Sequence, residues 1–421
     1  MNSRKRLQLT LDHQQPDRVA IDFGASFITG MHVSIVHQLR QRLLGDHDYL
    51  VKVIEPYQML GEVDDKLRKA LNIDVVGVAG RKSLLGTEAK DWKPWKLQDG
   101  TCCLVPGNFN VTPAPDGGWY MHPGGDTRLA PSAHMPGGGY FFDTIVRQDP
   151  IDEEKLNVED NLEEFGLLGP EDLATWQERK RWLKERSDYG GLLSAPGTAF
   201  GDIALVPAPW MPHPKGIRDI AEWYISTRTR RDYVWAIFEK QCEYALRNLK
   251  TLIDLFGDLV QVVILTGTDF GTQRGPFISP AAYRDLYKPF HKQLNDFVHK
   301  NSSWKTFIHS CGSVYQLLPD FIDAGFDILN PVQCSAAEME APRLKREFGS
   351  KVVFWGGGVD TQKTIAFGTP DQVRAEVRQR VEIFSKGGGF VFNAIHNVQG
   401  NTPIENVLAM FEVLHELTPA G

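Results

Sequence analysis

The sequence predicts an α/β protein, a (β/α)8 TIM barrel formed by residues 1–421 as a single domain, with a β-rich insertion at about 81–155. Three observations favour this fold class. Short apolar runs rich in β-branched and aromatic residues alternate with amphipathic stretches, which is typical of parallel strands joined by crossover helices. About eight such strand–helix units fit the chain, and α/β barrels commonly exceed about 200 residues. No G-x-G-x-x-G segment opens a helix after an early strand, which disfavours an open nucleotide-binding sheet.

The first part of the barrel is predicted from two strands and two helices. The runs VAIDFG at 19–24 and DVVGVAG at 74–80 predict buried strands, whereas the amphipathic stretches at 31–45 and 62–73 predict helices. Gly45 is expected to end the first of these helices as a C-cap.

The segment 81–155 is rich in glycine, proline and aromatic residues, and it predicts a small β insertion. Its Asp-Gly pairs, in DGTCCLV and DGGWYMH, lie between short apolar runs and predict hairpins. Residues 152–187 then predict charged helix with a solvated face, and a third barrel strand is expected near 188–206.

The C-terminal half alternates more regularly than the first half. It predicts five strands, at 260–265, 304–309, 327–332, 351–356 and 389–394, and five helices, at 279–300, 312–324, 335–348, 370–385 and 403–417.

Composition excludes several functional classes. The net charge is −7 and no basic run stands out, so nucleic-acid binding is not expected. No stretch of eighteen apolar residues predicts a membrane span, and the first residues contain no apolar core typical of a secretory signal. The five cysteines are odd in number and form no disulfide framework, which favours a cytoplasmic location.

Polar residues follow five successive predicted strands of the C-terminal half. Catalytic groups of a parallel barrel lie on the loops after its strands, so these residues are expected to line one pocket. We assign catalytic roles to Asp269, Gln333 and Asp360, and substrate binding to Thr268, Asn393 and Asn397. For Asp269 the alternative is a carboxylate that orders its own loop by accepting backbone N–H bonds.

His309 and Cys311 are the sharpest local feature of the sequence. An imidazole and a thiol two residues apart, directly after a strand and before Gly312, can reach one metal ion if the chain turns there. His396, on the loop after the last strand, is the candidate third ligand. The alternative is that Cys311 packs against apolar surface and His309 bonds to a carbonyl.

Three ordered segments, TDFGTQRGPFISPAAYRDLYKPFHKQL (268–294), HSCGSVYQLLPDFIDAGFDILNPVQ (309–333) and HNVQGNTPIENVLAMFE (396–412), resemble the uroporphyrinogen decarboxylase superfamily, as does the opening DRVAIDFGA. The resemblance covers most of the chain except the insertion. It implies a (β/α)8 barrel, commonly a homodimer.

The resemblance is closer to the zinc-dependent methylcobamide and corrinoid methyltransferases than to the decarboxylases. The R-Q-A-G-R-Y motif, whose arginines hold the carboxylates of the decarboxylase substrate, is replaced here by DRVAIDFGASF. The H-x-C-G element of the methyltransferases matches His309, Cys311 and Gly312. Their third zinc ligand is a cysteine seven residues before the proline of T-P-x-E-N, where this chain has His396. A glutamate used by some of them corresponds to Gln333 or a position near it.

Our first hypothesis is therefore a zinc-dependent methyltransferase or demethylase that acts on a small methylated molecule. Zinc would bind His309, Cys311 and His396. It would either hold a substrate thiol as the thiolate that accepts the methyl group, or act as a Lewis acid on a methoxy or amine leaving group while a corrinoid on a partner protein accepts the methyl group. The second hypothesis is a metal-free carboxy-lyase similar to uroporphyrinogen decarboxylase. The third is a binding module that kept the barrel without its catalytic activity.

Overall fold

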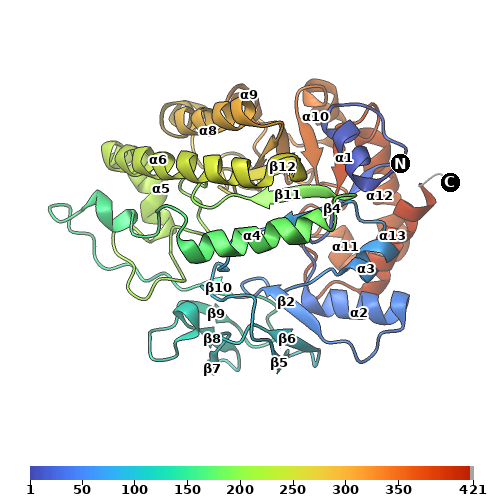
Figure 1. The fold of residues 1–421 in the computed structure, drawn as a ribbon, viewed down its shortest axis with the longest axis horizontal. Helices are drawn as coiled ribbons and strands as arrows, with labels where there is room; N and C mark the ends of the chain where they lie inside the picture. Colours follow the sequence, from blue (N-terminus) through green and yellow to red (C-terminus); the bar gives the residue numbers. More distant parts are fainter. Residues whose placement is uncertain (418–421) are drawn as a thin grey trace.

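The computed structural model describes residues 1–417, and its centre is a sheet of eight parallel strands (Figure 1). These strands are β1 (Ala20–Ile21), β4 (Val75–Val78), β11 (Gly190–Ser194), β12 (Val262–Thr266), β13 (Lys305–His309), β14 (Ile328–Asn330), β15 (Val353–Trp355) and β16 (Phe390–Phe392). From β4 to β16 they follow one another in chain order, and β16 pairs with β1. The remaining gap is bridged by the Asp74 amide, which donates to the Ile21 carbonyl at 2.8 Å. The predicted barrel is confirmed.

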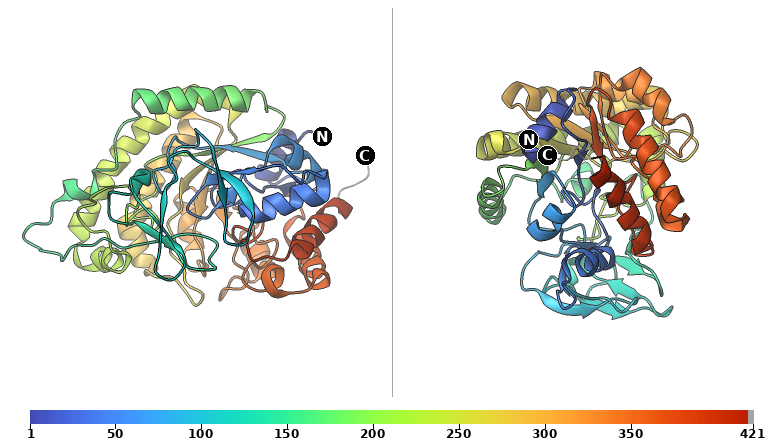
Figure 2. Two further views of the ribbon diagram at one scale, coloured as in Figure 1. Left: turned by 90° about the horizontal axis from the view of Figure 1, so that it is seen from below. Right: turned by 90° about the vertical axis from the view of Figure 1, so that its right-hand side faces the viewer.

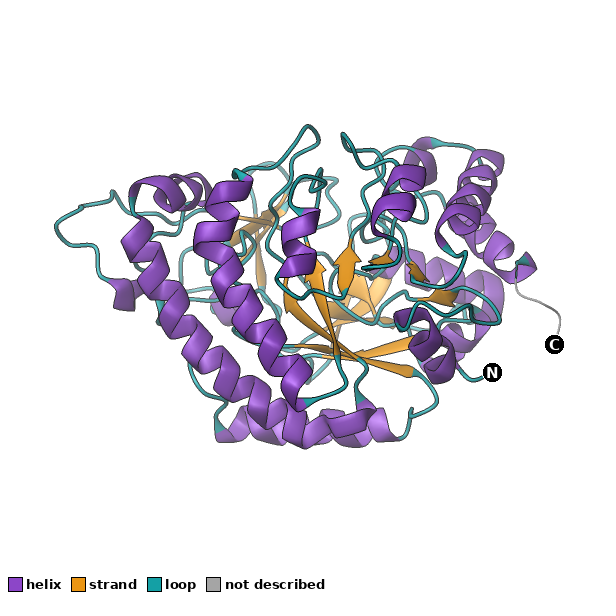
Figure 3. Ribbon diagram, turned by 90° about the horizontal axis from the view of Figure 1, so that it is seen from above, coloured by secondary structure: helices purple, strands orange, loops and turns teal. Residues whose placement is uncertain are grey.

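Helices surround the strands, as the view in Figure 3 shows. They are α1 (Ser3–Leu11), α2 (Val33–Leu44), α3 (Asp65–Ala70), α4 (Pro170–Lys184), α5 (Ile220–Thr229), α6 (Arg231–Phe256), α7 (Pro280–Ala282), α8 (Lys288–Asn301), α9 (Leu318–Asp323), α10 (Ala341–Phe348), α11 (Thr364–Phe367), α12 (Pro370–Phe384) and α13 (Ile404–Glu416). A π-helical turn, Tyr283–Tyr287, joins α7 to α8. Among the helices of residues 1–417, none combines the length and the apolar character needed to cross a bilayer.

Apolar side chains fill the barrel interior. Residues from all eight strands, among them Leu192, Val262, Phe307 and Trp355, form one buried cluster with Leu7 and Leu11 of α1. Leu7 packs so closely on Gly190 that a side chain at Gly190 would overlap it. Helix α1 therefore closes the N-terminal end, or bottom, of the barrel. The larger buried cluster lies mainly between the strands and the surrounding helices.

A charged network also lies at the bottom of the barrel. The fully buried Asp74 carboxylate accepts hydrogen bonds from Arg6 at 2.6 Å and from both terminal nitrogens of Arg18 at 2.7 and 2.9 Å. It also accepts the Ile21 amide at 2.9 Å. This network links α1 to the two strands that meet where the barrel closes.

The insertion contributes all strands of one small four-stranded sheet and two strands of another. One contains β7 (Val111–Pro113), β8 (Trp119–Met121), β9 (Ala133–Met135) and β10 (Asp143–Thr144); the other joins β5 (Lys93–Lys96) and β6 (Cys102–Val105) to β2 (Val51–Glu55) and β3 (Leu60–Gly61). Antiparallel pairs turn at both predicted Asp-Gly positions. In Figure 1 and in the right-hand view of Figure 2 these strands lie together below the barrel.

The sequence located the strands better than the helices. Gly45 ends α2 in the left-handed conformation, as predicted. Helices α9 and α10 begin six residues later than expected, because the preceding residues form the loops at the top of the barrel. The expected helix at 152–187 is limited to α4, which begins after Gly169. The 26-residue helix α6 was not predicted, although its buried residues recur with helical spacing.

Candidate metal centre

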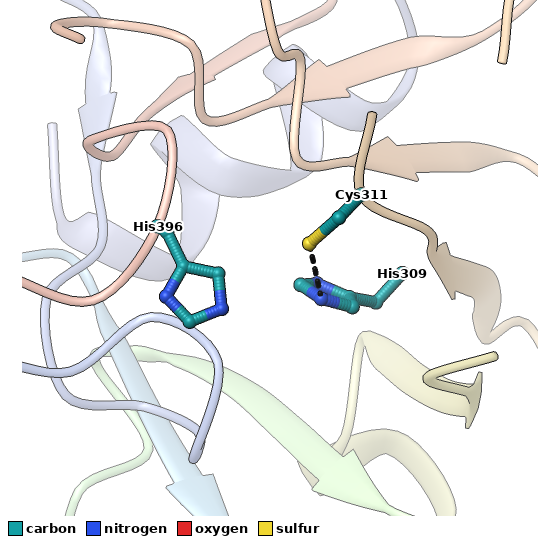
Figure 4. Close-up of side chains that lie close together, drawn as sticks. All are labelled: His309, Cys311 and His396. Carbon is teal, nitrogen blue, oxygen red and sulfur yellow. Dashed lines mark hydrogen bonds between the residues drawn. The ribbon is translucent and has the colours of Figure 1, made fainter. Parts of the chain in front are cut away.

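Three side chains with metal-binding atoms meet at the C-terminal end, or top, of the barrel (Figure 4). His309 is the last residue of β13, Cys311 lies in the loop that follows, and His396 lies in the loop after β16. One ligand atom from each lies within 4.8 Å of the others, and Cys311 Sγ is 3.4 Å from His309 Nε2. Strands β13 and β16 are distant in sequence, so the curvature of the barrel brings the third side chain to the first two.

The orientation of His309 is set by Asn330 at the end of the neighbouring strand β14. The Asn330 amide nitrogen donates to the Trp355 carbonyl at 2.8 Å, which leaves Asn330 Oδ1 as the acceptor facing His309. His309 Nδ1 therefore donates to Asn330 Oδ1, at 2.5 Å. The unprotonated Nε2 points at Cys311, and this is the arrangement that metal-binding histidines usually have.

The turn that carries Cys311 is held by side chains from two adjacent loops. The Cys311 amide donates to Asp269 Oδ1 at 2.6 Å, and the Gly312 amide donates to Gln333 Oε1 at 2.7 Å. Gly312 has φ 83° and packs on the backbone of Gly271, which leaves no room for a side chain. The glycine after Cys311 is thus required both by its conformation and by this close approach.

Burial keeps all three candidate ligands uncharged in the metal-free protein. It lowers the pKa of His309 and the pKa of His396 to about 4, so both imidazoles are neutral at pH 7. It raises the pKa of the Cys311 thiol well above its usual range, and the nearby Asp269 carboxyl adds to this effect. Two neutral imidazoles offer lone pairs without any proton loss, whereas the thiol must release its proton to a bound metal.

A cavity of about 180 Å³ adjoins two of the three side chains. Cys311 and His396 form part of its wall, and the remaining wall residues are Gly271, Thr272, Gln273, Gly312, Gln333, Thr361, Gln362 and Ile395. None of these residues is a lysine, arginine, aspartate or glutamate. The set of one sulfur and two nitrogen donors, with a cavity beside it, fits a zinc site that keeps one position open.

The sequence model of the uroporphyrinogen decarboxylase (URO-D) family matches residues 203–417, which include all three candidate ligands. The chain belongs to this family. It is 22% identical over 285 residues to a uroporphyrinogen decarboxylase of Prochlorococcus marinus, across 66% of this chain and 74% of that protein. It is 30% identical over 105 residues to the uroporphyrinogen decarboxylase of Methylococcus capsulatus, across 25% of this chain and 28% of that protein. A solved structure, a methyltransferase from Methanosarcina mazei, covers 99% of both chains with TM-score 0.54 and 14% identity, and so shares the fold.

The other residues predicted for the site are engaged in hydrogen bonds that shape the top of the URO-D barrel. Thr268 donates to the Phe200 carbonyl, and Asn393 donates to the Asp22 carbonyl. Asn397 accepts the Gly30 amide and donates to the Phe27 carbonyl and to Gln58. These bonds hold the loops at the top of the barrel, and substrate binding by these three residues stays a prediction.

The predicted catalytic residues differ in their positions. Gln333 lines the cavity, whereas Asp269 lies behind Cys311 and orders the backbone there, which was the alternative considered for it. Asp360 accepts the Gln362 amide at 2.7 Å and is not among the residues of the cavity wall in the described chain.

Sequence reasoning missed two residues near the centre. Asn330, which orients His309, is the last residue of a predicted strand, and that position is a signal for a residue at the barrel mouth. Asp202, on the loop after β11, is 7% exposed, and burial raises its pKa to about 7, with a further contribution from Asp269. No spacing in the sequence points to Asp202.

Proposed function

We propose that this chain is a zinc-dependent methyltransferase that demethylates a small methylated substrate and passes the methyl group to a corrinoid carried by a partner protein. The observation that carries the proposal is the convergence of His309, Cys311 and His396, with His309 already oriented by Asn330. The structural neighbour from Methanosarcina mazei is called a methyltransferase, but it supports only the fold.

The charge of the donor set favours demethylation over activation of a substrate thiol. Two neutral imidazoles and one thiolate leave a net charge of about +1 on zinc, so the bound ion would supply a Lewis acid to the leaving group of the substrate. When a methyl group is transferred, the electron pair of the broken bond stays on the substrate atom. The acceptor must therefore be a two-electron nucleophile, and a reduced corrinoid is such a nucleophile.

The residues of the chain have separate tasks in this proposal. Asn330 holds the His309 ring, and Asp269 and Gln333 fix the turn that presents Cys311. The Cys311 thiol lies against His309 Nε2 in the metal-free protein and loses its proton when a metal binds. Gln333 also lines the cavity, so it contacts a substrate bound there.

The second candidate is a carboxy-lyase that works without metal. It is favoured by the names of the curated relatives, which are uroporphyrinogen decarboxylases. A substrate with several carboxylates requires cationic partners in a buried site, and the cavity wall contains no lysine or arginine. This observation is the reason for ranking the decarboxylase second.

Metal analysis of the purified protein tests the proposal. We expect about one zinc per chain, lost in Cys311→Ser with the fold retained. Cys334→Ser is the matched control, because Cys334 is also partly buried, follows the next strand, and is not a member of the ligand group. Protein that stays zinc-free when purified without chelator and supplied with zinc would contradict the proposal.

The homodimer implied by the resemblance remains a prediction, which analytical ultracentrifugation checks.

A further inference from the structure

A hydrogen bond between two glutamines lies at the mouth of the cavity beside the metal centre. Gln273 Nε2 donates to Gln362 Oε1 at 3.2 Å, and both side chains form part of the cavity wall. Both glutamines are exposed, whereas Gly312 and Gln333 of the same wall are buried. The bond therefore lies at the solvent end of the cavity, and the less exposed Cys311 lies farther in.

The two glutamines come from loops that are not neighbours in the barrel. Gln273 follows β12 and Gln362 follows β15, and the strands β13 and β14 lie between these two in the sheet. The loops after β13 and β14 carry Cys311 and Gln333. A bond between the two outer loops therefore passes over the two inner loops. We call the pair Gln273 and Gln362 the strap.

The strap can open by movement of its side chains alone. The Gln273 carbonyl accepts the Ala337 amide at 3.0 Å, and the Gln362 amide donates to Asp360 Oδ1 at 2.7 Å, so both backbones are anchored. An exposed amide–amide bond competes with bonds to water, so its net contribution is small. Exposed side chains change rotamer within nanoseconds. The closed strap is therefore favoured only slightly and opens readily.

Outside the strap lies a wide surface groove of about 860 Å³, formed by α11 and α12. Gln362 belongs to the walls of both the groove and the inner cavity, so the strap separates the two spaces. The inner cavity has a volume of about 180 Å³. At about 30 Å³ per water molecule this is roughly six water volumes. A larger reactant therefore has to approach the metal centre from the groove with the strap open.

We propose that Gln273 and Gln362 gate the metal centre: their hydrogen bond restricts access from the groove to Cys311, and its opening admits reactants. The purpose of the gate rests on the proposed function, because a closed mouth keeps water from a bound substrate until the methyl acceptor arrives. The gate itself is a property of the metal-free protein and can be measured there.

Alkylation of the Cys311 thiol by iodoacetamide, in the metal-free full chain, measures access through the strap. Peptide mass spectrometry compares Cys311 with Cys102, which is exposed on the insertion and reports the reagent alone. Gln273→Met and Gln362→Met keep the length of the side chains but cannot form the bond. Each should raise the Cys311 rate, relative to Cys102, by about two- to five-fold. The double variant should raise it no further, because both substitutions remove the same bond.

Charged pairs test the gate in the opposite direction. Gln273→Glu with Gln362→Lys, and the reverse pair Gln273→Lys with Gln362→Glu, replace the bond by an ion pair without changing the net charge. Both should slow alkylation by about two-fold at low salt. The effect should disappear at 1 M salt, where the screening length is about 3 Å, whereas a change in packing alone would persist. Iodoacetamide is neutral, so the new charges do not attract or repel it.

The control is Gln379→Met, because Gln379 is an exposed glutamine that lines the groove and is not among the described residues of the cavity wall. It should leave the Cys311 rate unchanged. A wild-type Cys311 rate in both single methionine variants of the strap overturns the inference, as does a rate in the double variant that is the product of two separate increases.

The outcomes separate this inference from the proposed function. If the strap controls alkylation but neither zinc binding nor methyl transfer is found, the proposed function fails and the gate stands. If zinc binds and methyl transfer occurs but the strap variants are alkylated at the wild-type rate, the proposed function stands and this inference fails.

Discussion

At the bottom of the barrel the buried Asp74 carboxylate is neutralised by Arg6 and Arg18, whereas at the top Asp202 and Asp269 form no ion pair within residues 1–417. The bottom charges are satisfied by groups of the chain itself and join α1 to the closure of the barrel. At the top, burial raises the pKa of both carboxyls, and the thiol and imidazoles beside them are neutral.

The buried charges at the bottom of the barrel stabilise the fold, whereas the buried groups at the top are available for function. A buried ion pair whose partners are all present holds its geometry, and removing one partner leaves an uncompensated charge. Buried titratable groups without an internal counter-ion are a feature of functional sites, where a ligand or metal supplies the missing charge. We therefore expect substitutions at the bottom to change folding, and substitutions at the top to change metal binding.

The largest effect is expected from Asp74→Asn at the bottom. The substitution leaves Arg18 without its negative partner and Arg6 with Asp17 as its remaining one, so the free energy of unfolding should fall by about 3–5 kcal/mol in urea denaturation. Asp254→Asn, which removes an exposed carboxylate paired with Lys250, should cost less than about 1 kcal/mol. Similar losses from both substitutions would contradict the stabilising role of the bottom network.

Asn330→Ala tests the top of the barrel. Without the Asn330 oxygen, the His309 ring loses the acceptor that fixes its tautomer, and zinc affinity should fall by about 10- to 100-fold in chelator competition. Asn406→Ala is the control, because Asn406 is equally buried and bonds only to the Ile365 and Gly368 carbonyls. An unchanged zinc affinity in Asn330→Ala would contradict the orienting role of Asn330 toward a zinc-binding His309.

The pH dependence of zinc affinity distinguishes the thiol from the imidazoles. The sequence alone predicts that affinity falls as the histidines protonate near pH 6.5. Burial instead lowers their pKa to about 4 and raises the pKa of Cys311, so between pH 6 and 8 one proton, from the thiol, is released per zinc. Affinity should rise by about ten-fold per pH unit over this range, as measured with zinc buffers. A steeper slope below pH 6.5 would place the histidine pKa values back in their ordinary range.

At pH 5 the smallest effect on stability is expected from Asp202→Asn, the counterpart at the top of Asp74→Asn. The pKa of Asp202 is raised to about 7 in the folded protein, so the folded state binds more protons than the unfolded state between pH 4 and 7. The stability from this group is present at low pH and is lost as pH rises to 7. The free energy of unfolding of the variant should therefore lie within about 1 kcal/mol of the wild-type value at pH 5 and exceed the wild-type value at pH 8. A loss of unfolding free energy at pH 8 as large as that of Asp74→Asn would show that the buried carboxylates at the two ends of the barrel contribute alike to stability.

The sequence by itself determined the barrel, because near-continuous apolar strands must be covered on both faces, and a closed barrel covers one face with its own interior and the other with helices. It also determined the Gly45 cap, the Asp-Gly hairpins, and the placement of His309, Cys311 and His396 directly after strands. These features depend on local periodicity, backbone conformation and the position of a residue relative to the end of its own strand.

Only the tertiary structure decided how the candidate site is assembled. The pairing of β13 with β14 places Asn330 beside His309, and the loop after β12 brings Asp269 to the Cys311 amide instead of to the cavity. Backbone carbonyls of neighbouring loops likewise accept hydrogen bonds from Thr268, Asn393 and Asn397. Contacts between the ends of adjacent strands depend on register and loop path. The burial that sets each pKa depends on the whole packed barrel, which no local spacing encodes.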